Sequence, residues 1–86
     1  SREELAVSQL LGEKTIWCGP AIDEKPLRGF VQVRAHGAPL DCTYYYAGGR
    51  LVADLDKPLL GIANGQAMVI YDGDRVVGSA TICESA

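Results

Sequence analysis

A mostly basic row of alternate residues in the segment 27–36 is the clearest chemical feature of this sequence. In an extended strand, residues two apart point to the same face. One face would carry Arg28, Phe30, Gln32, Arg34 and His36. Guanidinium groups donate paired hydrogen bonds to phosphate oxygens, so this row is a candidate phosphate-binding face. Spacing alone fits a solvated outer strand face equally well.

The distribution of charge supports the same segment. The chain has a formal net charge of -3, which taken alone argues against a nucleic-acid partner. Residues 25–50 nevertheless contain four basic side chains against Asp41 alone, while both flanking segments are acidic. The four are Lys25, Arg28, Arg34 and Arg50. Whether they form one patch depends on the fold.

Other polar residues offer less chemistry. His36 is the only histidine and has no nucleophile or carboxylate partner nearby in the sequence. Asp72 and Asp74 are better interpreted as turn residues than as metal ligands, because a hard cation needs more oxygen ligands at fixed spacing. No phosphate-binding loop motif is present. The chain by itself is predicted to be non-catalytic, with no cofactor or metal site.

Aromatic residues and cysteines give weaker signals. Trp17 and the tyrosines at 44–46 could stack on bases, but consecutive strand residues alternate, so at least one tyrosine is expected in the core. Cys18, Cys42 and Cys83 are an odd number without a C-x-x-C pair. This argues against a disulfide framework and a zinc site, and favours buried thiols in a reducing cytoplasm.

The elements that must position these residues are strands. At 86 residues the chain suits one small domain, and no apolar run approaches the roughly 20 residues that span a bilayer. Gly48-Gly49 and Asp72-Gly73 each predict a two-residue hairpin turn, although the second hairpin carries no visible chemistry of its own. Strands are expected at 15–18, 27–35, 41–47, 50–55 and on both sides of Asp72-Gly73. Such spacing indicates an all-β barrel or sandwich.

The first twelve residues do not show a strand pattern. Ser1 and Glu4 have capping-box spacing, a short apolar stripe follows, and Gly12 is a plausible stop. We expect a short N-terminal helix or turn here. Because the chain begins without methionine in a charged run, it is also expected to be a fragment.

Two longer motifs carry a family resemblance. They read PLLGIANGQ at 58–66 and VIYDGDRVVG at 69–78, followed by Ile82. Together with Glu3-Glu4-Leu5 and Ile16-Trp17, they resemble the C-terminal domain of the bacterial tRNA-specific 2-thiouridylases, the MnmA/TrmU family. The resemblance covers nearly the whole chain.

This resemblance implies a fold and a role. The fold would be a small antiparallel β-barrel like the second domain of translation elongation factors, formed by residues 1–86. The parent would be an ATP-dependent tRNA-uridine 2-sulfurtransferase that thiolates the wobble uridine with persulfide sulfur from a sulfur-carrier protein. In the family, an N-terminal domain holds the ATP-binding loop and the catalytic cysteines, so the three cysteines here inherit no catalytic role.

The resemblance also implies RNA-binding residues. The family's central strand commonly reads I-R-Y-R-Q and touches tRNA, and it matches positions 33–37 here. Arg34 is retained, Ala35 replaces the aromatic residue, and His36 replaces the second arginine. The candidate tRNA-binding residues are therefore Arg34, His36 and Arg28. The alternative is a structural or protein-interaction barrel that packs against other domains of its parent without touching RNA.

Overall fold

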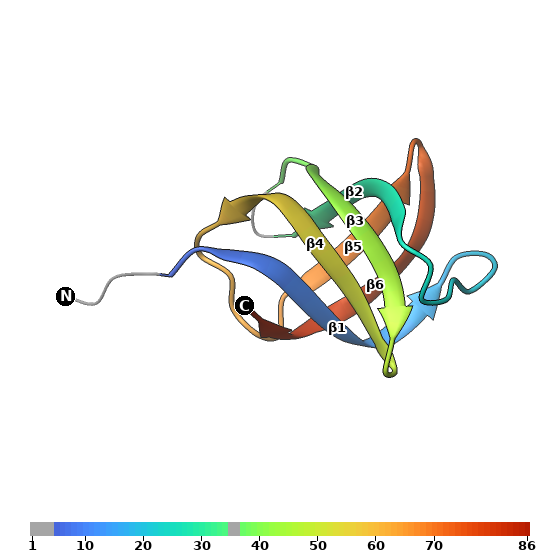
Figure 1. The fold of residues 1–86 in the computed structure, drawn as a ribbon, viewed down its shortest axis with the longest axis horizontal. Coiled ribbons are helices and arrows are strands. Elements are labelled where there is room, and N and C mark those ends of the chain that lie inside the picture. Colours follow the sequence, from blue (N-terminus) through green and yellow to red (C-terminus); the bar gives the residue numbers. More distant parts are fainter. Residues whose placement is uncertain (1–4, 35–36) are drawn as a thin grey trace.

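The chain forms a closed antiparallel barrel of six strands in the computed structural model, which describes residues 5–34 and 37–86 (Figure 1). The strands are β1 (Val7–Trp17), β2 (Leu27–Val33), β3 (Leu40–Ala47), β4 (Arg50–Leu59), β5 (Ala67–Asp72) and β6 (Arg75–Ser85). Around the barrel they follow the order β1-β4-β3-β2-β5-β6, and β1 closes the sheet by pairing with both β4 and β6. The all-β prediction is confirmed, as a barrel and not a sandwich.

Side-chain alternation places the core inside the barrel. In β2, Val31 and Val33 are fully buried, while Arg28 and Phe30 on the opposite face are exposed. The predicted alternation of this strand is therefore confirmed. The main buried residues come from all six strands and are Leu10, Val31, Val33, Cys42, Tyr44, Leu51, Ala53, Leu55, Met68, Ile70, Val77, Ala80 and Ile82.

Both predicted hairpins are present, but the turn of the second is shifted by one residue. Gly48 and Gly49 have φ angles of 61° and 75° and connect the Ala47–Arg50 pair, as a type I′ turn requires. The second hairpin closes at the pair Asp72–Arg75, so its central residues are Gly73 and Asp74 instead of Asp72 and Gly73. Gly73 takes the positive φ of 61° at the first central position, which suits a type II′ turn.

The expected N-terminal helix is wrong where the structure describes the segment. β1 begins at Val7 and continues through Gly12, which pairs with Leu51 of β4 and Ile82 of β6. An isolated helix of this length is marginal in water, whereas these backbone groups satisfy two sheet edges that would otherwise be open. Ser1 and Glu4 lie outside the described residues. No helix in the described part of the chain is long and apolar enough to cross a membrane.

The other strand boundaries shift modestly. β4 runs on through Pro58 to Leu59 instead of ending near Asp56. The β1–β4 register shifts between Val7 and Gln9, opposite this part of β4. Proline lacks an N–H and is tolerated in sheets at such irregularities. β2 ends at Val33, which places Arg34 at the start of the following turn.

Candidate nucleic-acid interface

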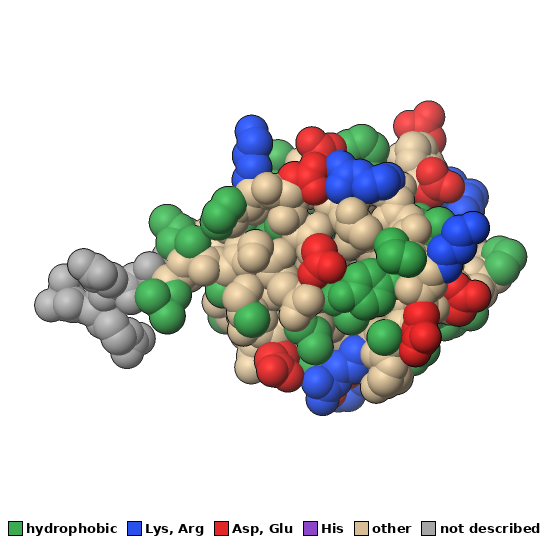
Figure 2. Space-filling view, viewed as in Figure 1, with side chains coloured by type: hydrophobic (Ala, Val, Ile, Leu, Met, Phe, Trp, Pro, Cys, Tyr) green, Lys and Arg blue, Asp and Glu red, His purple; other side chains and the backbone are tan. Residues whose placement is uncertain are grey.

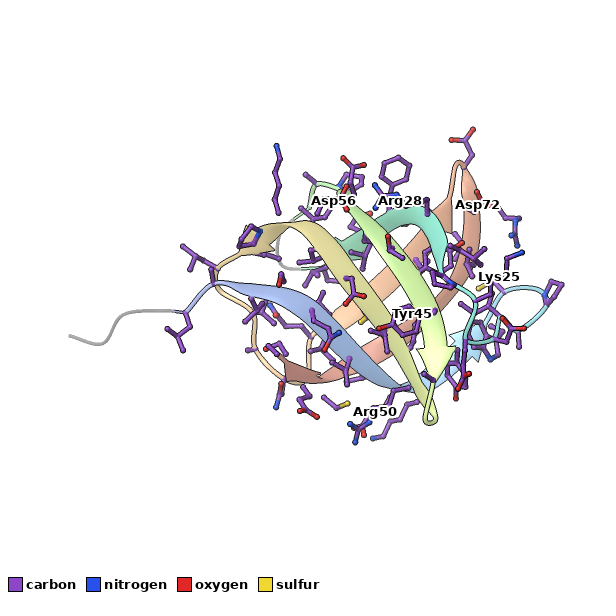
Figure 3. The ribbon with its side chains drawn as sticks, viewed as in Figure 1. Lys25, Arg28, Tyr45, Arg50, Asp56 and Asp72 are labelled. Carbon is purple, nitrogen blue, oxygen red and sulfur yellow. The ribbon has the colours of Figure 1, made fainter. Side chains whose placement is uncertain are left out.

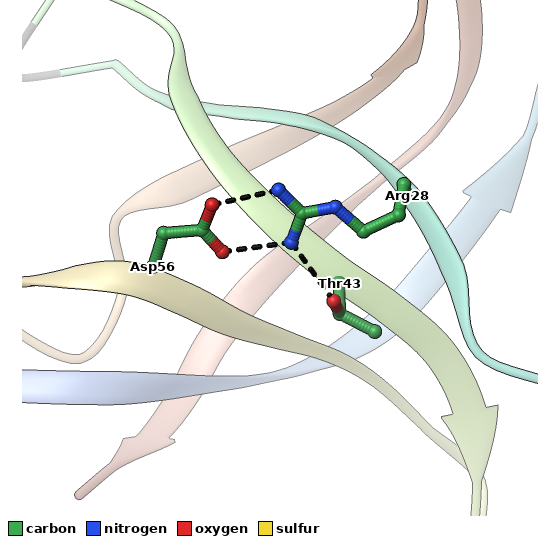
Figure 4. A network of polar contacts seen from close by, with 3 residues as sticks. All are labelled: Arg28, Thr43 and Asp56. Carbon is green, nitrogen blue, oxygen red and sulfur yellow. Dashed lines mark hydrogen bonds and ion pairs between the residues drawn. The ribbon is translucent and has the colours of Figure 1, made fainter.

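Arg28 is held in an ion pair on the outside of the barrel. Its Nη1 and Nη2 donate to Oδ1 and Oδ2 of Asp56 at 2.7 and 2.6 Å, and Nη1 also donates to Oγ1 of Thr43 at 3.0 Å (Figure 4). The side chain thus reaches from β2 across β3 to β4. The hydrogen bonds between the two groups raise the pKa of Arg28 and lower the pKa of Asp56. The guanidinium fork that could bind a phosphate is therefore already engaged by a carboxylate.

The basic residues of segment 25–50 do not converge into one patch. Lys25, Arg28 and Arg50 project from well-separated places on the barrel (Figure 3). Arg50 pairs with Glu84 at 3.2 Å, and Arg75 pairs with Asp72 at 3.5 Å. On the face drawn in Figure 2, basic and acidic side chains are interspersed. Two of the four basic side chains of segment 25–50, Arg28 and Arg50, are thus paired with acids from β4 and β6.

Arg34 differs from the other described arginines. Its side chain is exposed, and no carboxylate of the described residues lies within 4.0 Å of its guanidinium. Its backbone N–H donates to the carbonyl of Ala67 at 3.1 Å, which ties the position to the start of β5. An exposed guanidinium on an anchored backbone remains available for an anionic ligand.

The turn that contains Arg34 is anchored at its far side as well. Nε2 of Gln32 donates to the carbonyl of Gly37, and the Gly37 N–H donates to the carbonyl of Val33 at 3.4 Å. Gly37 has a φ of 79°, a conformation that glycine adopts at little cost. His36, the second candidate of this turn, lies outside the described residues.

A surface groove lies over the paired strands β2 and β5. Its volume is about 390 Å³. The lining residues are Phe30, Gln32, Pro39, Tyr71, Gly73 and Asp74. A neighbouring hollow of about 270 Å³ shares Gln32 and Tyr71 with the groove and adds Arg34 and Val69. The groove therefore adjoins the hollow that Arg34 lines.

Tyr71 is the residue of this surface that the sequence analysis missed. It lies in the second hairpin and pairs across the sheet with Phe30. Strand alternation could have predicted its outward direction, because Met68 and Ile70 are the buried positions of β5 and Tyr71 is one residue beyond Ile70. Which strand would lie beside β5 could not be read from that alternation.

Comparison with known proteins identifies the domain. A family profile described as "Aminomethyltransferase beta-barrel domain" matches residues 7–82. The chain belongs to this β-barrel family. It is 45% identical over 85 residues to the tRNA-specific 2-thiouridylase MnmA of Thermobifida fusca, covering 99% of this chain and 23% of that protein. It is 49% identical over 80 residues to the MnmA of a Nocardioides species, covering 93% of this chain and 21% of that protein.

The resemblance to the C-terminal barrel of the tRNA-specific 2-thiouridylases is thus confirmed. The MnmA of Acidothermus cellulolyticus gives the same result, with 43% identity over 83 residues and coverage of 96% of this chain. The chain spans between a fifth and a quarter of the length of these three relatives.

Most of the other aromatic residues considered for base stacking pack against the barrel itself. Tyr44 is buried in the core, which confirms that at least one tyrosine points inward. Trp17 and Tyr46 pack edge to face, with ring centroids 5.2 Å apart and an interplanar angle of 71°. Tyr45 is half-buried on the outer face, where partial burial and the nearby Asp54 raise its pKa.

The cysteines and the paired aspartates show no shared site. Cys42 is buried, and burial raises the pKa of its thiol to about 12, so it is a poor nucleophile. Cys83 is half-buried, whereas Cys18 is exposed, so the expectation of buried thiols is wrong for Cys18. Asp72 accepts a hydrogen bond from Arg75, and Asp74 occupies the β5–β6 turn. The described residues contain no group of three or more His, Cys, Asp or Glu side chains that could hold a metal ion.

Proposed function

We propose that this chain is the tRNA-binding and positioning barrel of an ATP-dependent tRNA-uridine 2-sulfurtransferase that thiolates the wobble uridine. The observation that carries the proposal is Arg34. It is exposed, has no ion-pair partner among the described residues, and occupies the position that matches the first arginine of the family's RNA-contacting strand. The 2-thiouridylase names of the relatives support the same substrate.

The proposed division of labour follows from what the barrel contains. Arg34 would donate to tRNA phosphate oxygens, and His36 would add a second contact that strengthens when a nearby phosphate favours its protonated form. Arg28 is a weaker candidate, because binding RNA would require it to exchange the Asp56 carboxylate for a phosphate. ATP binding, sulfur transfer from a persulfide and docking of a sulfur-carrier protein would belong to other parts of the enzyme, which we place in the cytoplasm.

The test is Arg34→Ala in the full-length enzyme, with tRNA affinity measured across a series of salt concentrations. Removing one phosphate contact should weaken binding at every salt concentration and reduce the slope of log K against log [salt] by about 1. Arg50→Ala is the matched control, because the Arg50 guanidinium is paired with Glu84 and lies away from the turn. We expect Arg50→Ala to leave the slope unchanged.

The alternative function is an interdomain packing role without RNA contact. Leu5 and Leu60 favour it, because they are 83% and 53% exposed and flank the paired residues Val7 and Leu59 at one end of the barrel. Exposed apolar side chains gathered at one end suit a protein contact. Wild-type tRNA affinity and salt slope in Arg34→Ala would reject the RNA-binding proposal in favour of this alternative.

A further inference from the structure

The β2–β5 groove is lined by two aromatic residues and adjoins the hollow that contains Arg34. Phe30 and Tyr71 are directly opposed residues of neighbouring strands, and Phe30 is 37% exposed. We infer that this groove seats an unpaired base of the bound RNA, stacked against Phe30 and Tyr71, with the adjoining phosphate on Arg34. The inference rests on the proposed function, and it specifies which part of an RNA the barrel binds.

Size and composition fit a nucleobase. The groove volume of about 390 Å³ lies at the lower end of the range for small-ligand sites and is large enough for one base. Two aromatic side chains and Pro39 supply apolar surface, and Gln32 supplies an amide at the rim. Stacking on aromatic rings requires only the π-face that every base possesses, so these residues give affinity without strict sequence preference.

Arg34 lies where the phosphate next to a base bound in the groove would be. Gln32 and Tyr71 line both the groove and the hollow that contains Arg34, so a base in the groove and a phosphate at Arg34 would occupy adjoining sites. Arg34 follows Gln32 by two residues, at the start of the turn after β2. At the opposite end, the Asp74 carboxylate disfavours a phosphate and can accept a hydrogen bond from a base N–H.

Single-stranded RNA fits this arrangement better than a duplex. Bases in a helix are stacked on one another, and proteins contact double-stranded RNA mainly through its backbone and 2′-hydroxyls. Aromatic side chains stack on bases that are splayed out in loops or single strands. The groove should therefore discriminate between the two forms of RNA, whereas Arg34 alone should not.

The experiment measures binding of the full-length enzyme to a mixed-sequence single-stranded RNA oligonucleotide and to a length-matched blunt duplex. In Phe30→Ala and Tyr71→Leu, affinity for the single strand should fall by about 5- to 100-fold, while affinity for the duplex changes less than about twofold. Tyr71→Phe retains the ring and should bind like the wild type. Tyr45→Leu is the control, because it removes an outward tyrosine of β3 that does not line the groove.

The outcomes separate the inference from the proposed function. If the groove variants lose equal affinity for the single strand and the duplex, or lose affinity for neither, the inference that the groove stacks a base is overturned. If Arg34→Ala weakens tRNA binding while the groove variants bind like the wild type, the tRNA-binding barrel stands and the groove assignment falls. If the groove variants lose single-strand affinity and Arg34→Ala changes nothing, the groove stands without the Arg34 contact. Groove variants that lower thermal stability but leave RNA affinity unchanged would give the groove a structural role and overturn the inference.

Discussion

At the residue scale, Arg28 on β2 and Arg34 in the turn that follows β2 have different surroundings. Arg28 reaches a carboxylate two strands away, and Arg34 reaches none among the described residues. Both groups of the Arg28–Asp56 pair are substantially exposed, with side-chain exposures of 61% and 41%. Exposed ion pairs contribute little to folding, so this contact matters more for occupying a guanidinium than for stability.

The Asp56 ion pair predicts a specific pH dependence. Because Arg28 lowers the pKa of folded Asp56 below its unfolded value of about 3.9, the stability that Asp56 contributes is complete above that value. It is lost as the pH falls from about 4 through the lower folded pKa. The difference in melting temperature between wild type and Asp56→Asn should therefore be constant near neutral pH and shrink below about pH 4.

The control for this prediction is the same substitution in an Arg28→Met background. Without the guanidinium, Asp56 has no ion pair to lose. The difference in melting temperature caused by Asp56→Asn should therefore no longer shrink below about pH 4. A wild-type difference that stays the same from pH 6 down to pH 3 would contradict the assigned cause.

At the scale of the elements, glycines decide how closely strands approach. A Cβ on Gly12 would lie 2.6 Å from Cβ of Ala80 and 3.2 Å from Sδ of Met68, inside the barrel. The sequence suggested that Gly12 ends a helix, but its role is to leave room for Ala80 and Met68 on the inner face of β1. A strand glycine often marks such a close approach.

Gly12→Ala should accordingly destabilise the barrel by about 1–3 kcal/mol through overpacking. Chemical denaturation of the 86-residue chain measures the free energy of unfolding. The double variant with Ala80→Gly removes the clashing methyl and should recover part of the loss, giving a favourable coupling energy between the two sites. Strictly additive effects would show that the close contact is not the cause.

At the scale of the whole molecule, closure makes the strands depend on one another. β1 pairs with strands from the middle and the end of the chain, and its Trp17 packs on Tyr46 of β3. The buried residues form one cluster drawn from all six strands. A single core of this kind favours all-or-none unfolding.

We expect Trp17 fluorescence and far-ultraviolet circular dichroism of the chain to report one coincident transition. Leu10 is fully buried on β1, and Leu10→Ala should lower the free energy of unfolding by about 2–5 kcal/mol and shift both signals together. Leu5→Ala is the control, because that side chain is 83% exposed and outside β1. Separate transitions for the two signals would contradict a single cooperative barrel.

The sequence predicted the features that depend on near neighbours. Alternation in residues 27–33 separated the buried valines from the outward row, and paired glycines located the β3–β4 hairpin. The terminal motifs identified the family. Segment 7–12 was misread because a short apolar stripe fits helix and strand alike, and only pairing with β4 and β6 distinguishes them.

What the tertiary structure alone decided is which polar and aromatic groups meet. Asp56 lies 28 residues from Arg28, and the sheet order brings them together, leaving Arg34 as the described arginine without a carboxylate partner. The same order places β5 beside β2, so that Tyr71 and Phe30 form one groove next to that guanidinium. Local sequence determines the direction in which a strand residue points, but strand order and register determine its neighbours, because those depend on the closing of the whole barrel.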